Sequence, residues 1–162
     1  MDDRFFMREA INEARKALEI GEVPIGAVVV CNGKIVGRGH NLTESTNDPT
    51  AHAEILAIRE AAKTLKNWRL TDCILYSTVE PCIMCTGALI LARVKEVVYG
   101  VPDPKFGGSV SLYSIPTDVR LNHNFKVRKG PFGDEIAQMM RDFFRNLRKE
   151  RHDQRGDHQG DS

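Results

Sequence analysis

The order of apolar and polar residues predicts an N-terminal helix followed by a hairpin. Within residues 3–19 apolar side chains recur in steps of three and four, which is the period of an amphipathic helix. The next apolar run, Pro24 to Cys31, is continuous and β-branched, as in a strand that is covered on both faces. Asn32-Gly33 is a strong hairpin signal, so residues 34–40 are expected to return as the partner strand.

Helical and strand-like segments alternate after the hairpin. Strands are expected at residues 73–76, 96–100 and 125–128, and helices at residues 50–65, 81–93 and from about 134 onward. Because parallel strands need such crossovers, this order predicts an α/β fold: a mixed sheet with helices on its faces.

The length and composition predict one folded domain. The chain has 162 residues, of which 41% are hydrophobic, which is enough for a proper core. Residues 1–150 are expected to form this domain, whereas residues 151–162 carry no aliphatic or aromatic side chain and are expected to be a disordered polar tail. The longest apolar run, Ile25 to Cys31, is too short to cross a membrane.

Charge and cysteine usage narrow the picture further. A formal net charge of +1 does not by itself indicate a partner. Four cysteines without a secretory start favour the reducing cytoplasm, where a Cys-x-x-Cys motif binds metal or does redox chemistry.

Two short stretches carry the candidate chemistry, each at a predicted helix start. His52, Cys82 and Cys85 offer one imidazole and two thiolates, and Glu54 offers a spare carboxylate. Three protein ligands are typical of a catalytic zinc, whose fourth position holds a water with its pKa lowered from about 15.7 to about 7. The dipoles of the two helices would favour thiolate and stabilise negative charge on the attacking oxygen.

Each half of this pattern has a simpler explanation when taken alone. His-x-Glu occurs by chance in many helices, and Pro-Cys-x-x-Cys also occurs in redox dithiols and in four-cysteine structural zinc sites. The remaining cysteines, Cys31 and Cys73, lie singly inside strand-like runs, which disfavours a four-cysteine site. The two halves together therefore favour a catalytic zinc.

Three further features stay open on residue chemistry alone. Asn41 is either a turn-forming residue or a hydrogen-bonding partner for a substrate base. The glycine-rich stretch 103–109 is expected to be a surface loop at the mouth of a site rather than a phosphate-binding loop. The basic excess at residues 141–151 is either a solvated helix face or a contact to a phosphate backbone.

His-x-Glu followed by Pro-Cys-x-x-Cys is the signature of zinc nucleobase deaminases. From about Met7 to Lys149 the chain more closely resembles the bacterial tRNA-specific adenosine deaminases. The motifs that carry this resemblance are Gly21–Ala27, His40-Asn41, Pro49–Glu54, Glu80–Cys85, Asp103–Lys105 with Gly107-Gly108, Leu121–His123 and Phe143–Arg148. The resemblance implies a three-layer α-β-α cytidine deaminase-like fold with a five-stranded sheet. It also implies a homodimer with a shared site, and conversion of the wobble adenosine of a tRNA anticodon stem-loop to inosine.

The resemblance also implies roles for individual residues. One Zn²⁺ per subunit would be held by His52, Cys82 and Cys85, and Glu54 would move protons. The implied substrate contacts are Asn41 at the target base, Asp103 and Lys105 along the anticodon-loop groove, and Phe144, Arg145 and Arg148 near the flanking nucleotides.

Two observations keep other functions in view. Asn124 stands where these deaminases usually have Arg, which weakens the case for a phosphate contact there. The stretch Asn47–Glu54 is equally typical of bacterial guanine deaminases, so a free base is the alternative substrate. A zinc-stabilised RNA-binding module without catalysis is the third possibility, and it leaves Glu54 unexplained.

Overall fold

The computed structural model describes residues 2–159 and contains one five-stranded sheet in the order β2-β1-β3-β4-β5. β1 pairs antiparallel with β2 and with β3, whereas β3, β4 and β5 run parallel to one another. In chain order the elements are α1 (Asp3–Glu19), β1 (Gly26–Cys31), β2 (Lys34–His40), α2 (Ala53–Leu65), β3 (Cys73–Val79), α3 (Ile83–Leu91), β4 (Glu96–Val101), the 3-10 helix η1 (Ile115–Thr117), β5 (Lys126–Lys129) and α4 (Gly133–Gln159).

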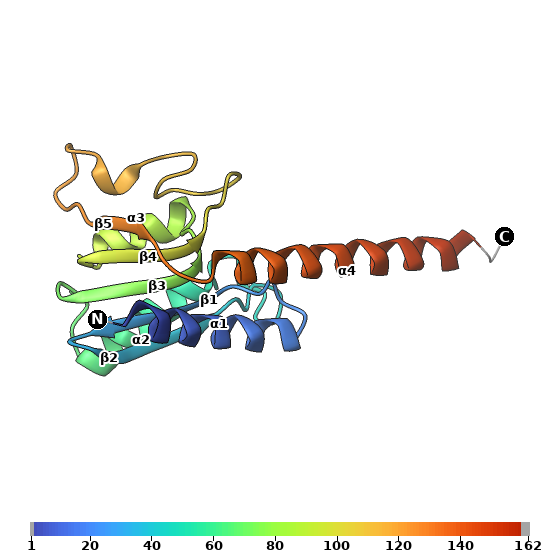
Figure 1. Cartoon of the computed structure of the whole chain (residues 1–162), viewed down its shortest axis with the longest axis horizontal. Helices are drawn as coiled ribbons and strands as arrows, with labels where there is room; N and C mark the ends of the chain where they lie inside the picture. The colour runs from blue at the N-terminus through green and yellow to red at the C-terminus, as the bar shows by residue number, and fades with distance from the viewer. Residues whose placement is uncertain (1, 160–162) are drawn as a thin grey trace.

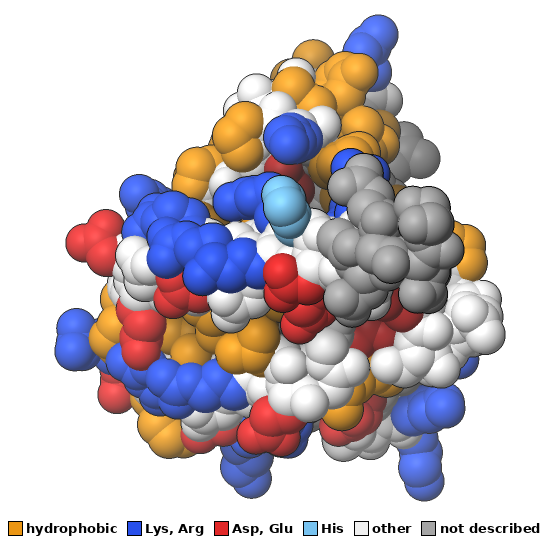
Figure 2. All heavy atoms as spheres, turned by 90° about the vertical axis from the view of Figure 1, so that its right-hand side faces the viewer, with side chains coloured by type: hydrophobic (Ala, Val, Ile, Leu, Met, Phe, Trp, Pro, Cys, Tyr) orange, Lys and Arg blue, Asp and Glu red, His pale blue; other side chains and the backbone are white. Residues whose placement is uncertain are grey.

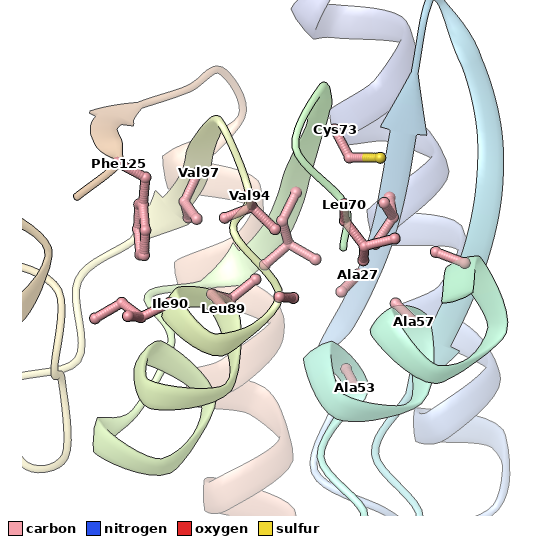
Figure 3. Packing of buried hydrophobic residues seen from close by; sticks show 14 residues of the cluster. Ala27, Ala53, Ala57, Leu70, Cys73, Leu89, Ile90, Val94, Val97 and Phe125 are labelled. Atoms are coloured by element: carbon pink, nitrogen blue, oxygen red, sulfur yellow. The ribbon is translucent and has the colours of Figure 1, made fainter. Parts of the chain in front are cut away.

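Helices cover both faces of this sheet, which confirms the expected three-layer α-β-α fold. Alternate residues of β1 face opposite layers: Val28 and Val30 pack with α1, and Ala27 and Val29 pack with α2 and α3. Figure 1 shows α1 in front of the sheet and α4 projecting from its edge. Figure 3 shows side chains of α2, α3 and the strands converging in the core on the α2 and α3 side of the sheet.

Helix α2 lies unusually close to strand β2 because two glycines face it. A Cβ added at Gly37 would lie 2.2 Å from the carbonyl oxygen of Ala57, and one added at Gly39 would lie 2.2 Å from that of Ala53. The facing helix residues Ala53 and Ala57 are themselves fully buried. The absence of side chains on β2 at these two positions therefore fixes where α2 begins.

The C-terminal helix differs from the expectation. Residues 151–159 continue α4, where the composition predicts a disordered tail, and residues 160–162 lie outside the described part of the chain. The prediction of a disordered tail considered only the composition of residues 151–162 and not the helix that precedes them. Extending a formed helix avoids the cost of nucleation, so a polar segment without a core-facing stripe can still continue it.

No helix within residues 2–159 combines the length and the apolar character that crossing a membrane requires.

Gly37→Ala should destabilise the protein, because its methyl group would collide with the backbone of α2. We expect the free energy of unfolding to fall by about 1–3 kcal/mol, measured by urea denaturation of metal-loaded protein. Gly87→Ala in α3 is the matched control, since a Cβ there meets nothing within 4 Å. That variant should be stabilised by about 0.5–1 kcal/mol. Equal effects of the two changes would contradict the close packing of α2 on β2.

Candidate metal centre

The two predicted metal stretches meet at the starts of α2 and α3. His52 is the N-cap residue of α2, and Cys82 is the N-cap residue of α3. Both have extended backbones, and neither makes a side-chain capping hydrogen bond. Cys85 lies in the first turn of α3, on the side of Cys82. Pro81 therefore lies just before the N-cap residue, two positions before the first helical residue Ile83, and not at the first helical position that was expected for it.

The three ligand atoms are spaced as a tetrahedral zinc requires. The Nδ1 atom of His52 lies 3.5 Å from the Sγ atoms of both Cys82 and Cys85. All three atoms lie within 4.8 Å of one another. Zinc with bonds of about 2.3 Å to sulfur and about 2.05 Å to nitrogen would separate nitrogen from sulfur by about 3.6 Å. Across residues 2–159 this is the one group of three or more His, Cys, Asp or Glu side chains with metal-ligand spacing.

The surroundings of the two cysteines shift their pKa values in opposite directions. The hydrogen bond with Cys85 lowers the pKa of the Cys82 thiol to about 4, because it and the neighbouring His52 outweigh the effect of burial. The same hydrogen bond, together with burial, raises the pKa of Cys85. The pair thus carries one thiolate at neutral pH, and a bound metal would displace the proton of Cys85.

Glu54 lies beside the ligand group without belonging to it. It is the second residue of α2, and only 4% of its surface is exposed. Burial raises the pKa of this carboxyl to about 7, against the opposing hydrogen bond with Cys85. A carboxyl group with a pKa near neutrality can both accept and donate a proton, which is what general acid–base catalysis needs.

Asn41 has a structural role that the sequence did not predict. Its Oδ1 accepts a hydrogen bond of 2.9 Å from the backbone N–H of Ala53, and the residue is 6% exposed. Asn41 therefore caps α2 from outside the helix, where the N-cap residue His52 does not. The contact between Asn41 and a target base stays a prediction.

The other predicted substrate residues lie in the loop after β4 and on α4. Asp103 stabilises a turn in the loop after β4, since its Oδ1 accepts hydrogen bonds from the backbone N–H groups of Lys105 and Phe106. Lys105 itself is exposed. Phe144, Arg145 and Arg148 are exposed on α4. Figure 2 views the end from which α4 projects and shows Lys, Arg, Asp and Glu side chains intermingled there.

Asn124 closes a turn where the resembling deaminases usually have Arg. Its Nδ2 donates hydrogen bonds of 2.8 Å to the carbonyl oxygens of Pro116 and Asp118. The preceding His123 is held by a 2.7 Å hydrogen bond between its Nε2 and the carbonyl oxygen of Val94. This segment therefore has a loop-closing function in the described structure.

Glu80 is the residue of this region that sequence reasoning missed. Only 2% of it is exposed, directly after a strand whose seven residues are all buried. Burial by itself would raise the pKa of Glu80, but hydrogen bonds from Ser111, Asp103 and Val110 hold it below its usual value. Its position in the sequence could have indicated this role, because a carboxylate that follows a fully buried strand needs hydrogen-bond donors from the protein.

Comparisons with known proteins agree with this geometry. The family profile of the MafB19-like deaminases matches residues 1–148. The tRNA-specific adenosine deaminase of Bacillus subtilis strain 168 is 50% identical over 149 residues, which cover 92% of each chain. A solved structure from work on tRNA:A34 deaminases superposes with a TM-score of 0.80 and 42% identity, covering 84% of this chain and 99% of the other.

A guanine deaminase of Bacillus subtilis is also similar, but over less of the chain. It shares 44% identity at a TM-score of 0.60, covering 63% of this chain and 66% of its own. The tRNA deaminases thus match more of the chain than this guanine deaminase does. By the family profile and by these relatives, the chain belongs to the MafB19-like deaminase family, in the group of the tRNA-specific adenosine deaminases.

Proposed function

We propose that this protein is a zinc-dependent tRNA adenosine deaminase that converts the wobble adenosine of an anticodon stem-loop to inosine. The observation that carries the proposal is the ligand group of His52, Cys82 and Cys85 with the buried carboxyl of Glu54 beside it. The deaminase family supplies the reaction class, and the tRNA-specific relatives supply the substrate class.

In this proposal each residue of the centre has one task. His52, Cys82 and Cys85 hold one Zn²⁺ per subunit, which supplies a water molecule activated near neutral pH. Glu54 accepts a proton from water and delivers protons to the ring nitrogen and to the amine at C6. Water replaces the amine, and ammonia is released. Burial of Glu54 supports this task, since it brings the pKa of the carboxyl to about 7.

The remaining residues would bind the RNA. A target base must leave its stack to reach the centre, which costs least in a single-stranded loop. Asn41 would contact the target base, and Asp103 and Lys105 would line the groove for the anticodon loop. Phe144, Arg145 and Arg148 would lie near the flanking nucleotides, and their exposure on α4 is compatible with that role.

We further propose a cytoplasmic homodimer. Seven large hydrophobic residues are exposed on α3 and on the loop between β4 and β5: Ile83, Leu91, Phe106, Val110, Leu112, Tyr113 and Val119. Several large hydrophobic side chains exposed on neighbouring segments are typical of an interface, and most soluble oligomers are built from identical copies. The four free cysteines suit a reducing compartment.

Zinc-loaded protein should convert adenosine in total tRNA to inosine, and Glu54→Ala should retain one zinc but lose activity by about 10²- to 10⁴-fold. Nucleoside analysis by mass spectrometry measures inosine, and elemental analysis measures zinc. His52→Ala is the matched comparison, because it should lose the metal as well. Xanthine from free guanine without inosine in tRNA would instead establish the guanine deaminase alternative. Tight tRNA binding with neither product would establish the non-catalytic module.

Arg148→Glu should weaken tRNA binding and flatten its salt dependence, because a contact to phosphate releases counterions. The slope of log Kd against log salt is expected to fall by about one unit or more, measured by fluorescence anisotropy in the inactive Glu54→Ala background. Lys63→Glu is the control, since this exposed residue lies at the opposite end of α2 from His52. Equal effects of the two charge reversals would remove Arg148 from the RNA interface.

The protein should sediment as a dimer of about twice its 18.2 kDa chain mass. Leu91→Asp, at a side chain that is 71% exposed, should shift it toward the monomer without changing the stability of the fold. Analytical ultracentrifugation measures the mass, and a monomeric wild-type protein at micromolar concentration would refute the homodimer.

A further inference from the structure

The loop after β4, residues 103–111, is wrapped around one buried carboxylate. Oε2 of Glu80 accepts hydrogen bonds from three consecutive backbone N–H groups, those of Ser109 at 3.2 Å, Val110 at 2.8 Å and Ser111 at 3.0 Å. Oε1 accepts a hydrogen bond of 3.0 Å from the N–H of Asp103 and another from the hydroxyl of Ser111. Both ends of the loop thus converge on a single side chain.

The same loop also forms the cap of the metal-binding helix α3. The first N–H of that helix, on Ile83, donates to the carbonyl oxygen of Phe106 at 3.2 Å. The N–H of Gly108 donates to the carbonyl oxygen of Pro81 at 3.0 Å, and Gly107 pairs with Cys82 as an isolated β-bridge. The loop backbone therefore satisfies donors and acceptors at the helix start that would otherwise need other partners.

The loop packs closely against Glu80 and the start of α3, and two of its glycines leave no space for a side chain. A Cβ added at Gly107 would lie 2.4 Å from Oε2 of Glu80, and one added at Gly108 would lie 2.7 Å from the Cα of Ile83. The buried hydroxyls of Thr86 and Ser109 lie 2.9 Å apart and join α3 to the end of the loop. The loop and the helix start that carries Cys82 are consequently in close contact.

We infer that Glu80 is a positioning residue for substrate binding: it holds the loop that carries Asp103 and Lys105 at a fixed place beside the metal centre. This inference rests on the proposed function, in which that loop lines the groove for the anticodon. Glu80 acts through the loop and not on the reacting base. Its loss should therefore affect RNA affinity more than the chemical step.

Glu80→Gln is the first test, because it keeps the shape of the side chain but cannot accept all five hydrogen bonds. We expect KM for tRNA to rise about tenfold, the equivalent of one lost hydrogen bond to a charged group, with kcat changed by less than about threefold. Zinc content should stay at one per chain. Ser111→Ala, which removes only the hydroxyl contact, should change KM in the same direction by less.

Glu9→Gln is the matched control. Glu9 is a partly buried carboxylate on α1, paired with Arg38 at 2.8 Å, on the face of the sheet opposite α2 and α3. It should leave KM and kcat unchanged. A fall in kcat at constant KM in Glu80→Gln, or a loss of zinc, would overturn the positioning role. So would wild-type kinetics in both Glu80→Gln and Ser111→Ala.

A double-mutant cycle tests whether Glu80 acts through the loop. In the inactive Glu54→Ala background, adding Lys105→Ala to Glu80→Gln should weaken tRNA binding by no more than about twofold beyond the larger single effect. Losses that multiply would overturn the inference.

Hydrogen exchange separates this inference from the proposed function. The amide groups of Ser109, Val110 and Ser111 should lose protection in Glu80→Gln, with or without RNA. Unchanged protection would refute the anchor even in an active enzyme. If the zinc-loaded wild-type protein neither binds nor deaminates tRNA, the proposed function and the RNA role of Glu80 both fail. The exchange data then still decide whether Glu80 holds the loop.

Discussion

The distance of 3.5 Å between Nδ1 of His52 and the two cysteine sulfurs is the constraint on which the rest of the structure depends. Two helix starts from different parts of the chain must bring their side chains close enough to bind one common ion. Helix α3 follows strand β3 after a short connection, whereas the position of α2 is set by its contact with the glycines of β2. Because both helices point their N-termini at this place, their dipoles stabilise thiolate and any negative charge that develops nearby.

Buried carboxylates hold the irregular segments around this centre. Oε1 of Glu22 accepts hydrogen bonds from the N–H and the hydroxyl of Ser45, at 2.6 and 2.8 Å, in the loop that leads to α2. Glu80 does the same for the loop beside α3. Loops have few backbone partners of their own, so a buried anion with several donors is an effective anchor. On both sides of the site, a buried carboxylate thus accepts the loop hydrogen bonds that a neighbouring strand would accept inside the sheet.

The sequence predicted the regular elements well, because their signals are local. Residues 3–19 and 34–40 form α1 and β2 with the expected bounds, since helical period and a hairpin turn act over a few positions. The ligand group followed from motif spacing and helix-start signals. The roles of Asn41 and Glu80 could not be predicted, since their partners lie 12 to 31 residues away and meet them only in the folded chain. The extension of α4 was missed because composition alone does not record the helix that precedes a polar segment.

One fold serves different substrates among the relatives, so the ligand group cannot by itself decide between a free base and an RNA. The guanine deaminase of Bacillus subtilis and the tRNA deaminases share similarity with this chain, but to different extents, at 63% and 84% coverage. The sheet and the starts of α2 and α3 carry the residues proposed for the reaction, so substrate choice must come from segments outside them. In the proposed function those segments are the loop held by Glu80 and residues 141–151 of α4, where positive side chains outnumber negative ones. The loop is held beside the start of α3, whereas α4 projects from the sheet (Figure 1). The proposed contacts on α4 would therefore bind nucleotides at a distance from the reacting base.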